Sequence, residues 1–376
     1  MVWLKNLRIK SANPRVRRRT VEKLAGSTNS HDTELLVASL EDNDAQVRCA
    51  AVRALEQAED ASCTASLLPA LRDPDHQVRT AAAQALGHRG DRAAVGALAA
   101  VLSDSCPEVR SAAAGALRCL NWKPETPEEV ARFEIAVGNA RAAAFAGNAA
   151  VTSLVGELKA DTSFHRRAAA EALKDVADPR RICPLLEALK DPEPHVRASA
   201  IHALERETDE KVTRELLKVF RDNDSKVRLA AVTVLARRLD TPPKHFLPLL
   251  RDTNFEIRLA AVQFLGKRPS PGSADALLPM LSDPDTDVRQ AVATALGAMK
   301  HRNAVEPLVV ALADEDCLVR AAAERALGLI DQAWAHSEAA QRARVRLKAL
   351  LEVRPSWVRS AIQQALERVG GPGATK

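Results

Sequence analysis

The same arrangement of apolar and small residues recurs along the chain at a nearly constant interval, and within each copy it follows helical spacing. In the second copy these residues occupy Val47, Ala50, Ala51, Ala54 and Leu55, which are positions i, i+3, i+4, i+7 and i+8. Residues with this spacing share one face of an α-helix. We therefore expect each copy to contain a helix buried along one side, with alanines where a neighbouring helix approaches closely.

The repeat reads D-x-x-x-x-V-R-x-A-A-x-x-A-L, and its arginine marks eleven copies. These arginines are Arg17, Arg48, Arg79, Arg110, Arg166, Arg197, Arg228, Arg258, Arg289, Arg320 and Arg359. Their spacing is constant to within one residue, except that it is longer after Arg110 and after Arg320. A leucine follows each arginine by seven residues, and an apolar residue precedes it by eight, within a segment such as 34–40 that predicts another helix. One helical hairpin cannot bury its apolar face alone, so the pattern predicts hairpins stacked into a solenoid.

The connections between the two predicted helices contain residues that end one helix and start the next. In Asp73-Pro74-Asp75, the proline disfavours helical backbone in the residue before it. Acceptor side chains stand where the second helix needs an N-cap, namely Asp44, Asp75, Asp224, Asn254, Asp285 and Asp316. Prolines late in the first helix remove a backbone donor and predict a kink at Pro69, Pro248 and Pro279.

This pattern resembles HEAT repeats, in the short bacterial form called the phycobilisome-lyase-like HEAT repeat, over nearly the whole chain. The resemblance implies an all-α fold, an α-α superhelix of about eleven helical hairpins. It also implies a hydrogen-bonded ladder between adjacent repeats, formed by an aspartate and an arginine six residues apart. The ladder residues are Asp42, Arg48, Asp73, Arg79, Asp104, Arg110, Asp191, Arg197, Asp222, Arg228, Asp252, Arg258, Asp283, Arg289, Asp314 and Arg320. Ser11, Ala160 and Val353 replace the aspartate in three copies, two of which are terminal, as in capping repeats.

We expect one continuous solenoid over residues 1–370, followed by a loose tail at 371–376. Residues 1–120 hold repeats 1–4, and residues 148–330 hold repeats 5–10. An inserted helical element occupies residues 121–147, within the long interval after Arg110. A lengthened C-terminal capping repeat occupies residues 331–370, with Trp334 and His336 in its extended connection.

The inserted element begins with a strong helix start. The sequence Thr-Pro-Glu-Glu at 126–129 offers an N-cap, a proline at the first helical position and acids near the positive end of the helix dipole. A helix to about Val137 is predicted, with Val130, Phe133 and Val137 on one face. The element either packs between repeats or contacts a partner, and the sequence leaves both open.

Composition removes several classes of function. Aromatic residues make up 3% of the chain and tyrosine is missing, which disfavours stacking surfaces for single-stranded nucleic acids. Apolar runs such as 93–102 reach about half of the roughly 20 residues of a membrane span, and no such run lies near the start. The six cysteines include no C-x-x-C pair, and we expect separate buried thiols in a reducing cytoplasm.

Basic charge is concentrated at the N-terminal end. Residues 1–23 have a net charge of +7, so the remaining residues sum to −2. Residues 1–10 place Trp3, Leu4 and Leu7 on one side of a predicted helix. This segment either packs as the first helix of the capping repeat or contacts an anionic surface. Apart from such a contact by residues 1–23, we expect no association with a membrane.

No pattern in the sequence supports catalysis. None of the nine histidines is followed by glutamate, so the His-Glu pair that HEAT-type deoxyhypusine hydroxylases use for their di-iron site is missing. His195 and His202 lie seven residues apart, which alone does not define a metal site. The sequence also lacks zinc-ligand spacing, a glycine-rich phosphate loop and a nucleophile elbow. We expect a non-enzymatic protein with no catalytic residue, no metal ligand and no cofactor.

The concave face of a solenoid is its natural binding surface. Residues one and five positions after each repeat arginine are expected to line it, and these twenty-two positions include four arginines and two glutamates. Such a surface is too weakly basic to track DNA and offers no aromatic pocket to hold a flipped base. Six neighbouring positions either form a shallow patch for a partner or pack on adjacent helices: Ala198, Leu229, Leu259, His202, Thr233 and Gln263.

We therefore predict a cytoplasmic, non-enzymatic scaffold or adaptor that binds a protein or peptide partner of unknown identity along its concave face. Two alternatives remain. One is a phycobilin-lyase-like subunit or another HEAT-type accessory factor, and the other is a nucleic-acid-binding or DNA-repair HEAT-like protein. The near-neutral concave face disfavours the second alternative.

Overall fold

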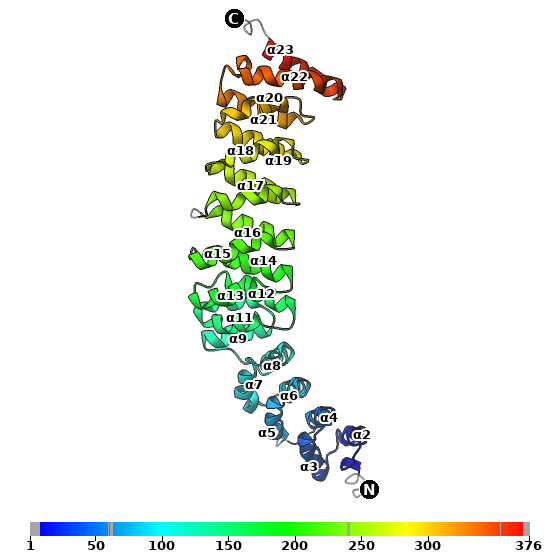
Figure 1. The fold of residues 1–376 in the computed structure, drawn as a ribbon. Helices are drawn as coiled ribbons and strands as arrows, with labels where there is room; N and C mark the ends of the chain where they lie inside the picture. The colour runs from blue at the N-terminus through cyan, green and yellow to red at the C-terminus, as the bar shows by residue number, and fades with distance from the viewer. Residues whose placement is uncertain (1–7, 59, 61–62, 239–240, 354, 371–376) are drawn as a thin grey trace. The chain divides into compact units, whose positions relative to one another are not determined.

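The computed structural model describes residues 8–58, 60, 63–238, 241–353 and 355–370, and every regular element among them is helical. The chain divides into two compact units, Met1–Leu204 and Glu205–Lys376. Within each unit, helical hairpins stack one after another (Figure 1). The predicted all-α solenoid of stacked hairpins is confirmed. The single continuous array over residues 1–370 stays a prediction.

In the first unit, the helices that carry the repeat arginines, here called second helices, follow one another with short first helices between them. The second helices are α2 (Pro14–Leu24), α4 (Ala45–Glu56), α6 (His76–Arg89), α8 (Pro107–Cys119), α12 (Ser163–Leu173) and α14 (Pro194–Ala203). The first-helix segments, with 3-10 turns labelled η, are α3 (Ser30–Ala38), η1 (Ser39–Glu41), α5 (Cys63–Leu67), η2 (Leu68–Arg72), η3 (Arg92–Ala94), α7 (Val95–Val101), α11 (Val151–Glu157), η5 (Pro179–Arg181) and α13 (Ile182–Ala188). The inserted element contains α9 (Pro127–Ala136), α10 (Ala140–Ala143) and η4 (Ala144–Ala150).

The second unit repeats the same arrangement. Its second helices are α16 (Ser225–Arg237), α17 (Phe255–Lys267), α19 (Thr286–Ala298), α21 (Cys317–Ile330) and α23 (Ser356–Gly370). Its first-helix segments are α15 (Glu210–Lys218), η6 (Val219–Arg221), η7 (Pro243–Arg251), α18 (Ser273–Leu277), η8 (Leu278–Ser282), η9 (Arg302–Ala304), α20 (Val305–Ala311), η10 (Trp334–His336) and α22 (Glu338–Val353).

The predicted N-caps of the second helices are confirmed. The Asp285 carboxylate accepts hydrogen bonds from the backbone N–H groups of Asp287 and Val288, at 3.0 and 3.2 Å. These bonds satisfy donors that have no partner within the first helical turn. The other predicted caps act in the same way: Asp44, Asp75, Asp224, Asn254 and Asp316.

The expected kinks at the first-helix prolines take the form of 3-10 turns. Pro69, Pro248 and Pro279 lie within η2, η7 and η8. Short 3-10 endings also occur without proline, because η1 and η6 span three residues each, whereas η2 and η8 span five. A 3-10 ending therefore does not require proline, and at these three prolines the 3-10 turn is longer.

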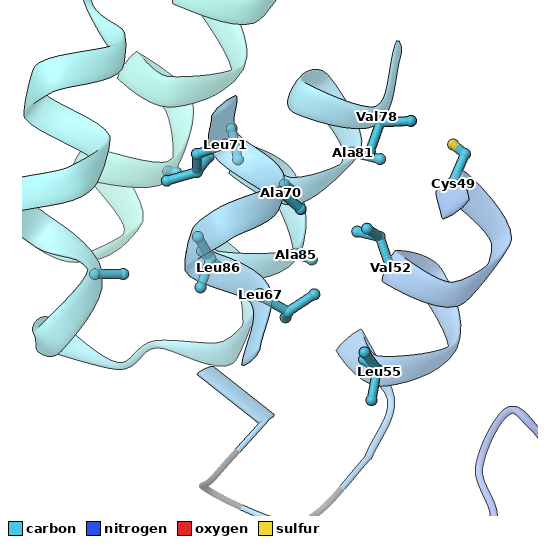
Figure 2. Packing of buried hydrophobic residues seen from close by; sticks show 14 of the residues in the cluster. Cys49, Val52, Leu55, Leu67, Ala70, Leu71, Val78, Ala81, Ala85 and Leu86 are labelled. Carbon is cyan, nitrogen blue, oxygen red and sulfur yellow. The ribbon is translucent and has the colours of Figure 1, made fainter. Parts of the chain in front are cut away.

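Small residues allow the second helices to approach closely and form the core. Val52 and Leu55 of α4 are fully buried together with Leu86 of α6 (Figure 2). On the other side of α6, a Cβ atom added at Gly87 would lie 2.6 Å from the Cα atom of Ala116 on α8. This separation is too short for a side chain, so the glycine sets the distance between α6 and α8.

The inserted helix α9 begins as predicted, because Thr126 and Glu129 form a reciprocal capping box and Pro127 is its first residue. The three residues expected on one face are not equally buried, because Val130 and Phe133 are half-buried and Val137 is exposed. The buried residues of α9 are Ala131, Ile135 and Ala136.

The last repeat is lengthened as the sequence indicates. Trp334 is buried in η10, and α22 spans 16 residues, more than any other first helix in the described residues. The predicted tail at 371–376, the apolar residues Trp3, Leu4 and Leu7, and the side chain of Val353 lie outside the described residues.

The expectation of buried thiols is correct for only part of the set. All six cysteines are free. Cys49 and Cys63 are buried and Cys106 is half-buried, whereas Cys119, Cys183 and Cys317 are exposed. Burial follows the position of each cysteine on its helix, so a cysteine within an amphipathic helix can still lie on the solvent side.

Candidate functional site

In most repeats, the arginine ties its own connection to the next one. The Nε and Nη2 atoms of Arg48 donate to the two carboxylate oxygens of Asp73 at 2.7 and 2.8 Å, and its Nη1 donates to the backbone carbonyl of Asp42 at 2.7 Å. Asp73 in turn accepts the backbone N–H of Asp75 at 2.8 Å. A two-point bond between guanidinium and carboxylate fixes both distance and orientation. The contact therefore holds successive hairpins in register.

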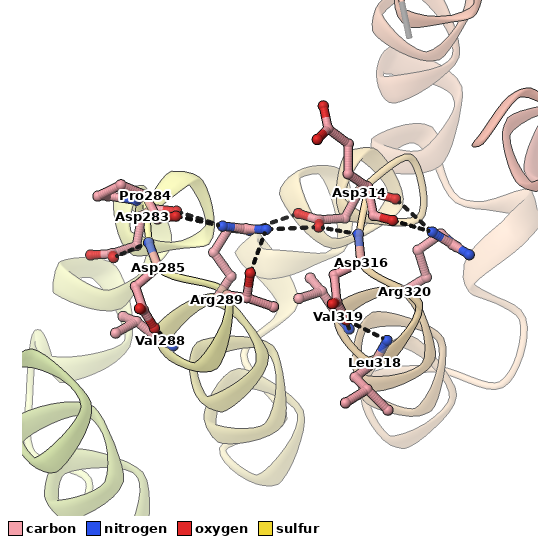
Figure 3. Close-up of polar contacts among 12 residues, drawn as sticks. Asp283, Pro284, Asp285, Val288, Arg289, Asp314, Asp316, Leu318, Val319 and Arg320 are labelled. Carbon is pink, nitrogen blue, oxygen red and sulfur yellow. Dashed lines mark hydrogen bonds and ion pairs between the residues drawn. The ribbon is translucent and has the colours of Figure 1, made fainter. Parts of the chain in front are cut away.

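The same two-point pair recurs through both units. Figure 3 shows the pair of Arg289 and Asp314, in which Arg289 also bonds the carbonyl of Asp283 at 2.9 Å. Within single units the pairs are Arg17–Asp42, Arg48–Asp73, Arg79–Asp104, Arg166–Asp191, Arg228–Asp252, Arg258–Asp283 and Arg289–Asp314. In these pairs the guanidinium side chains are 11–15% exposed. The arginines are thus occupied by structure and are not a row of free cations.

The remaining ladder residues bond to backbone groups in the loop between the two helices of their own repeat. Arg197 and Arg320 donate through Nη1 to the carbonyls of Asp191 and Asp314 at 2.8 and 2.9 Å. Asp222 accepts the backbone N–H of Asp224 at 2.9 Å.

Pairing changes the acidity of the ladder carboxylates. Burial raises the pKa of Asp73, but the bond from Arg48, the backbone N–H of Asp75 and the nearby arginine charges together lower it more, so the net pKa lies below its ordinary value near 3.8. Asp42, Asp191 and Asp252 show the same balance and the same net direction. The hydrogen bond from Asp73 likewise raises the pKa of Arg48. Both partners are therefore charged at neutral pH.

One rung of the ladder departs from this pattern, next to the inserted element. Ala160 takes the place of the aspartate, and Glu157 on α11 pairs instead with Arg110, through Nη2 only. The Nε atom of Arg110 is buried without a hydrogen-bond partner. The missing aspartate is evident from the repeat pattern, whereas the pairing of Glu157 with Arg110 was not predicted. The available signal was an acidic residue one helical turn before Ala160.

A pocket of about 680 Å³ lies beside this broken rung. Its walls come from the connection after α7, from α9 and from α11. The residues that line it are Leu102, Ser103, Asp104, Ser105, Arg110, Glu128, Arg132, Ile135, Ala149, Thr152, Ser153, Gly156, Glu157, Lys159 and Ala160. The inserted helix α9 thus forms one wall of a polar pocket.

Further pockets lie on the exposed side of the second helices. We call this side the second-helix surface, and it is formed around the residues one and five positions after each repeat arginine. Pockets of about 320, 620 and 460 Å³ lie between α2 and α4, between α6 and α8, and between α17 and α19. The last is lined by Leu259, Gln263, Gly266, Lys267, Asp287, Gln290, Ala291, Thr294, Ala295 and Ala298. Small side chains leave a shallow groove at each of these places.

The six predicted patch residues lie in both units. Ala198 is half-buried and His202 is exposed on α14 of the first unit. In the second unit, the four others lie on α16 and α17: Leu229, Thr233 and Leu259 are half-buried, and Gln263 is exposed. Leu259 and Gln263 line the groove between α17 and α19.

Charged residues on the second-helix surface are partly neutralised by their neighbours. Arg18 pairs with Glu22 at 3.0 Å and Arg167 with Glu171 at 3.4 Å, each within one helix. Among the described residues of the basic N-terminal end, Arg15 and Arg19 on α2 are exposed.

No group of three or more histidine, cysteine, aspartate and glutamate side chains in the part of the chain that the structure describes is placed to hold a metal ion. No helix in the described ranges is both long enough and apolar enough to cross a membrane.

Comparison with known families identifies the repeat. The family model for HEAT repeats matches residues 64–144, 151–236, 213–285, 243–328 and 274–367, which is well over half of the chain. The chain belongs to the HEAT-repeat family. HEAT solenoids are typical of protein-interaction scaffolds and are usually non-enzymatic.

Several solved structures are similar in fold. An engineered protein shares 22% identity over 96% of this chain and 97% of its own, with a TM-score of 0.29. Importin beta shares 16% identity over 97% of this chain, with a TM-score of 0.37, and this chain spans 61% of its length. Human deoxyhypusine hydroxylase shares 20% identity over 80% of this chain and 96% of its own, with a TM-score of 0.30. These low identities and scores limit the similarity to the repeat fold. No curated protein matches the chain in sequence.

Proposed function

We propose that this protein is a non-enzymatic scaffold that binds a protein or peptide partner along the second-helix surface. The groove between α17 and α19 is the observation that carries the proposal. Its walls are apolar or small at Leu259, Ala291 and Ala298 and uncharged at Gln263 and Thr294. Such a groove can receive side chains of a partner with little rearrangement.

The charge of the groove favours a protein over nucleic acid. Its two charged residues, Lys267 and Asp287, have opposite signs. Binding along a nucleic-acid backbone needs several lysines or arginines whose contacts release counterions. This groove offers one basic residue, so the surface suits a polypeptide better than a phosphate chain.

The finer features of the proposal follow from the sequence. A cytoplasmic location fits six free cysteines, because oxidising compartments favour disulfides. The bacterial phycobilisome-lyase-like subtype remains part of the proposal, and bilin attachment is an alternative outcome of the test.

Capture from the native cell with matched variants tests the proposal. One variant carries Gln263→Arg and Thr294→Arg, which place two charges in the groove at exposed positions. Its control carries Ser282→Arg and Asn303→Arg, at exposed positions of η8 and η9. We expect one or more proteins to be retained by the wild type and by the control but lost from the groove variant.

Retention of the same proteins by all three forms would contradict this assignment of the binding surface. Nucleic acid that is lost from the groove variant alone would contradict a protein partner. Visible absorbance acquired after incubation with a bilin, and lost in the groove variant, would favour the lyase-like alternative.

A further inference from the structure

We infer that the pocket beside the broken rung binds a small organic carboxylate, which supplies the acceptor that Ala160 withholds from Arg110. This inference concerns α9, α11 and the connection after α7, and it is independent of the proposed function of the second-helix surface.

The backbone around Ala160 keeps the geometry of an intact rung. Arg166 donates through Nη1 to the carbonyl of Ala160 at 2.9 Å, just as Arg197 donates to the carbonyl of Asp191 at 2.8 Å. The Ala160 methyl group therefore stands where a ladder aspartate begins. Ala160 and Arg110 both line the pocket.

In an intact rung, the aspartate at the position of Ala160 would pair with the guanidinium of Arg110. In every other rung described within a single unit, Nε and Nη2 both donate to one aspartate, as in Arg79 with Asp104 at 2.8 and 2.9 Å. Arg110 is 7% exposed, uses Nη2 for Glu157 and leaves Nε without a partner. A buried donor without a partner has lost its hydrogen bond to water and gained none in the protein. A ligand carboxylate beside Ala160 would supply that missing bond, which gives the pocket a preference for this group.

The rest of the lining supports an anion. Asp104 and Glu157 are engaged by Arg79 and Arg110, so they add no free negative charge. Arg132 on α9 and Lys159 after α11 have no ion-pair partner among the described residues, against the single carboxylate of Glu128.

The shape and the uncharged lining define the size and class of the ligand. The hydroxyl groups of Ser103, Ser105, Thr152 and Ser153 add donors, and Ile135 adds an apolar wall. A volume of about 680 Å³ lies within the range of small-molecule sites. The ligand is therefore a compact carboxylate with a short polar or apolar body.

Titration of the full chain with succinate, citrate and inorganic phosphate tests the inference. Calorimetry measures affinity, and ¹⁵N-resolved NMR follows the arginine Nε–H signals, with Arg110→Lys used to assign the Arg110 signal. We expect at least one of the two carboxylates to bind at millimolar concentration or below. Its binding should shift the Arg110 Nε–H signal toward those of the paired ladder arginines. No binding of either carboxylate, equal binding of phosphate, or an unmoved Arg110 signal would overturn the inference.

Variants separate the pocket from general charge effects. Ala160→Asp restores the ladder aspartate and should weaken carboxylate binding at least tenfold, because the chain then fills the site itself. The double variant Arg132→Gln with Lys159→Gln should weaken carboxylate binding by a similar factor. This variant tests the site even if Ala160→Asp fails to fold. Lys190→Gln is the control, since Lys190 is exposed and stands one repeat after Lys159, outside the pocket. Wild-type affinity in the double variant, or an equal loss in Lys190→Gln, would refute the site.

Discussion

Gly297 of α19 lies directly against Ala326 of α21: a Cβ atom on the glycine would stand 2.6 Å from the Cα atom of the alanine. Gly266 has the same relation to Ala295, at 2.9 Å from its Cβ atom. In these pairs, adjacent second helices thus meet through a glycine of one repeat and an alanine of the next. Their spacing depends on the absence of a single methyl group.

Replacement of Gly297 by alanine should therefore destabilise the second unit. The added methyl group forces α19 and α21 apart, and overpacking of this kind costs about 1–3 kcal/mol. Gly328→Ala is the matched control, because it is also a glycine within a helix and has open space around it. Alanine there should stabilise by about 0.5–1 kcal/mol. Urea unfolding measures both, and similar effects of the two variants would show that helix propensity, not packing, governs them.

Loss of a ladder carboxylate should cost far more than loss of a surface ion pair. Asp283 and Arg258 are 4% and 11% exposed, so Asp283→Ala leaves a buried guanidinium without its partner. Removing one member of a buried pair typically costs about 3–5 kcal/mol. Glu210→Ala in the same unit removes an exposed partner of Arg214 and should change the unfolding midpoint little. If both variants unfold at the same urea concentration, the ladder does not hold the repeats together.

Stability should decline in acid because of the ladder. The pKa values of Asp42, Asp73, Asp191 and Asp252 are lowered in the folded chain, since arginine bonds and charge together with a backbone hydrogen bond outweigh the opposing effect of burial. Their contribution is therefore complete above the ordinary value near 3.8 and is lost as the pH falls through the lower folded values. Urea midpoints should be level above about pH 5 and should fall steadily below it.

Asp252→Asn tests the assignment of this acid sensitivity. The variant should be less stable at neutral pH. Its stability should also decline less steeply in acid, because it lacks one carboxylate whose pKa is lower in the folded chain than in the unfolded chain. A decline as steep as that of the wild type would assign the effect to other groups.

The six thiols should fall into two reactivity classes. Cys119, Cys183 and Cys317 are exposed and should react first when a disulfide reagent is mixed with the native protein. Burial raises the pKa of Cys49 and of Cys63, so little of either thiol is present as thiolate. The reagent also cannot reach the buried sulfur atoms, so both cysteines should react only on unfolding. Burial, followed by the hydrogen bond to Glu108, also raises the pKa of Cys106, which should react slowly. Peptide mapping of the labelled cysteines measures the order, and early labelling of Cys49 or Cys63 would contradict the packing of α4 and α5.

Most of the local structure could be read from the sequence because its signals lie within a few residues of one another. The spacing of Val47, Ala50 and Leu55 placed the buried face of α4, and Asp285 marked the start of α19 through bonds to its own next residues. Thr126 and Glu129 marked the start of α9 in the same local way.

The sequence alone determined the hairpin, its caps and its stacking. Each copy of the pattern has an apolar face that only a neighbouring hairpin can bury, and the pattern recurs regularly along the chain. The tertiary structure decided the features that depend on distant residues. Arg110 meets Glu157 across 47 residues, and the inserted helix α9, which buries Ala131 and Ile135 instead of Val137, forms a pocket wall beside them. No local pattern encodes such contacts, because they follow from where the insertion places α11 and which side of each helix then meets solvent.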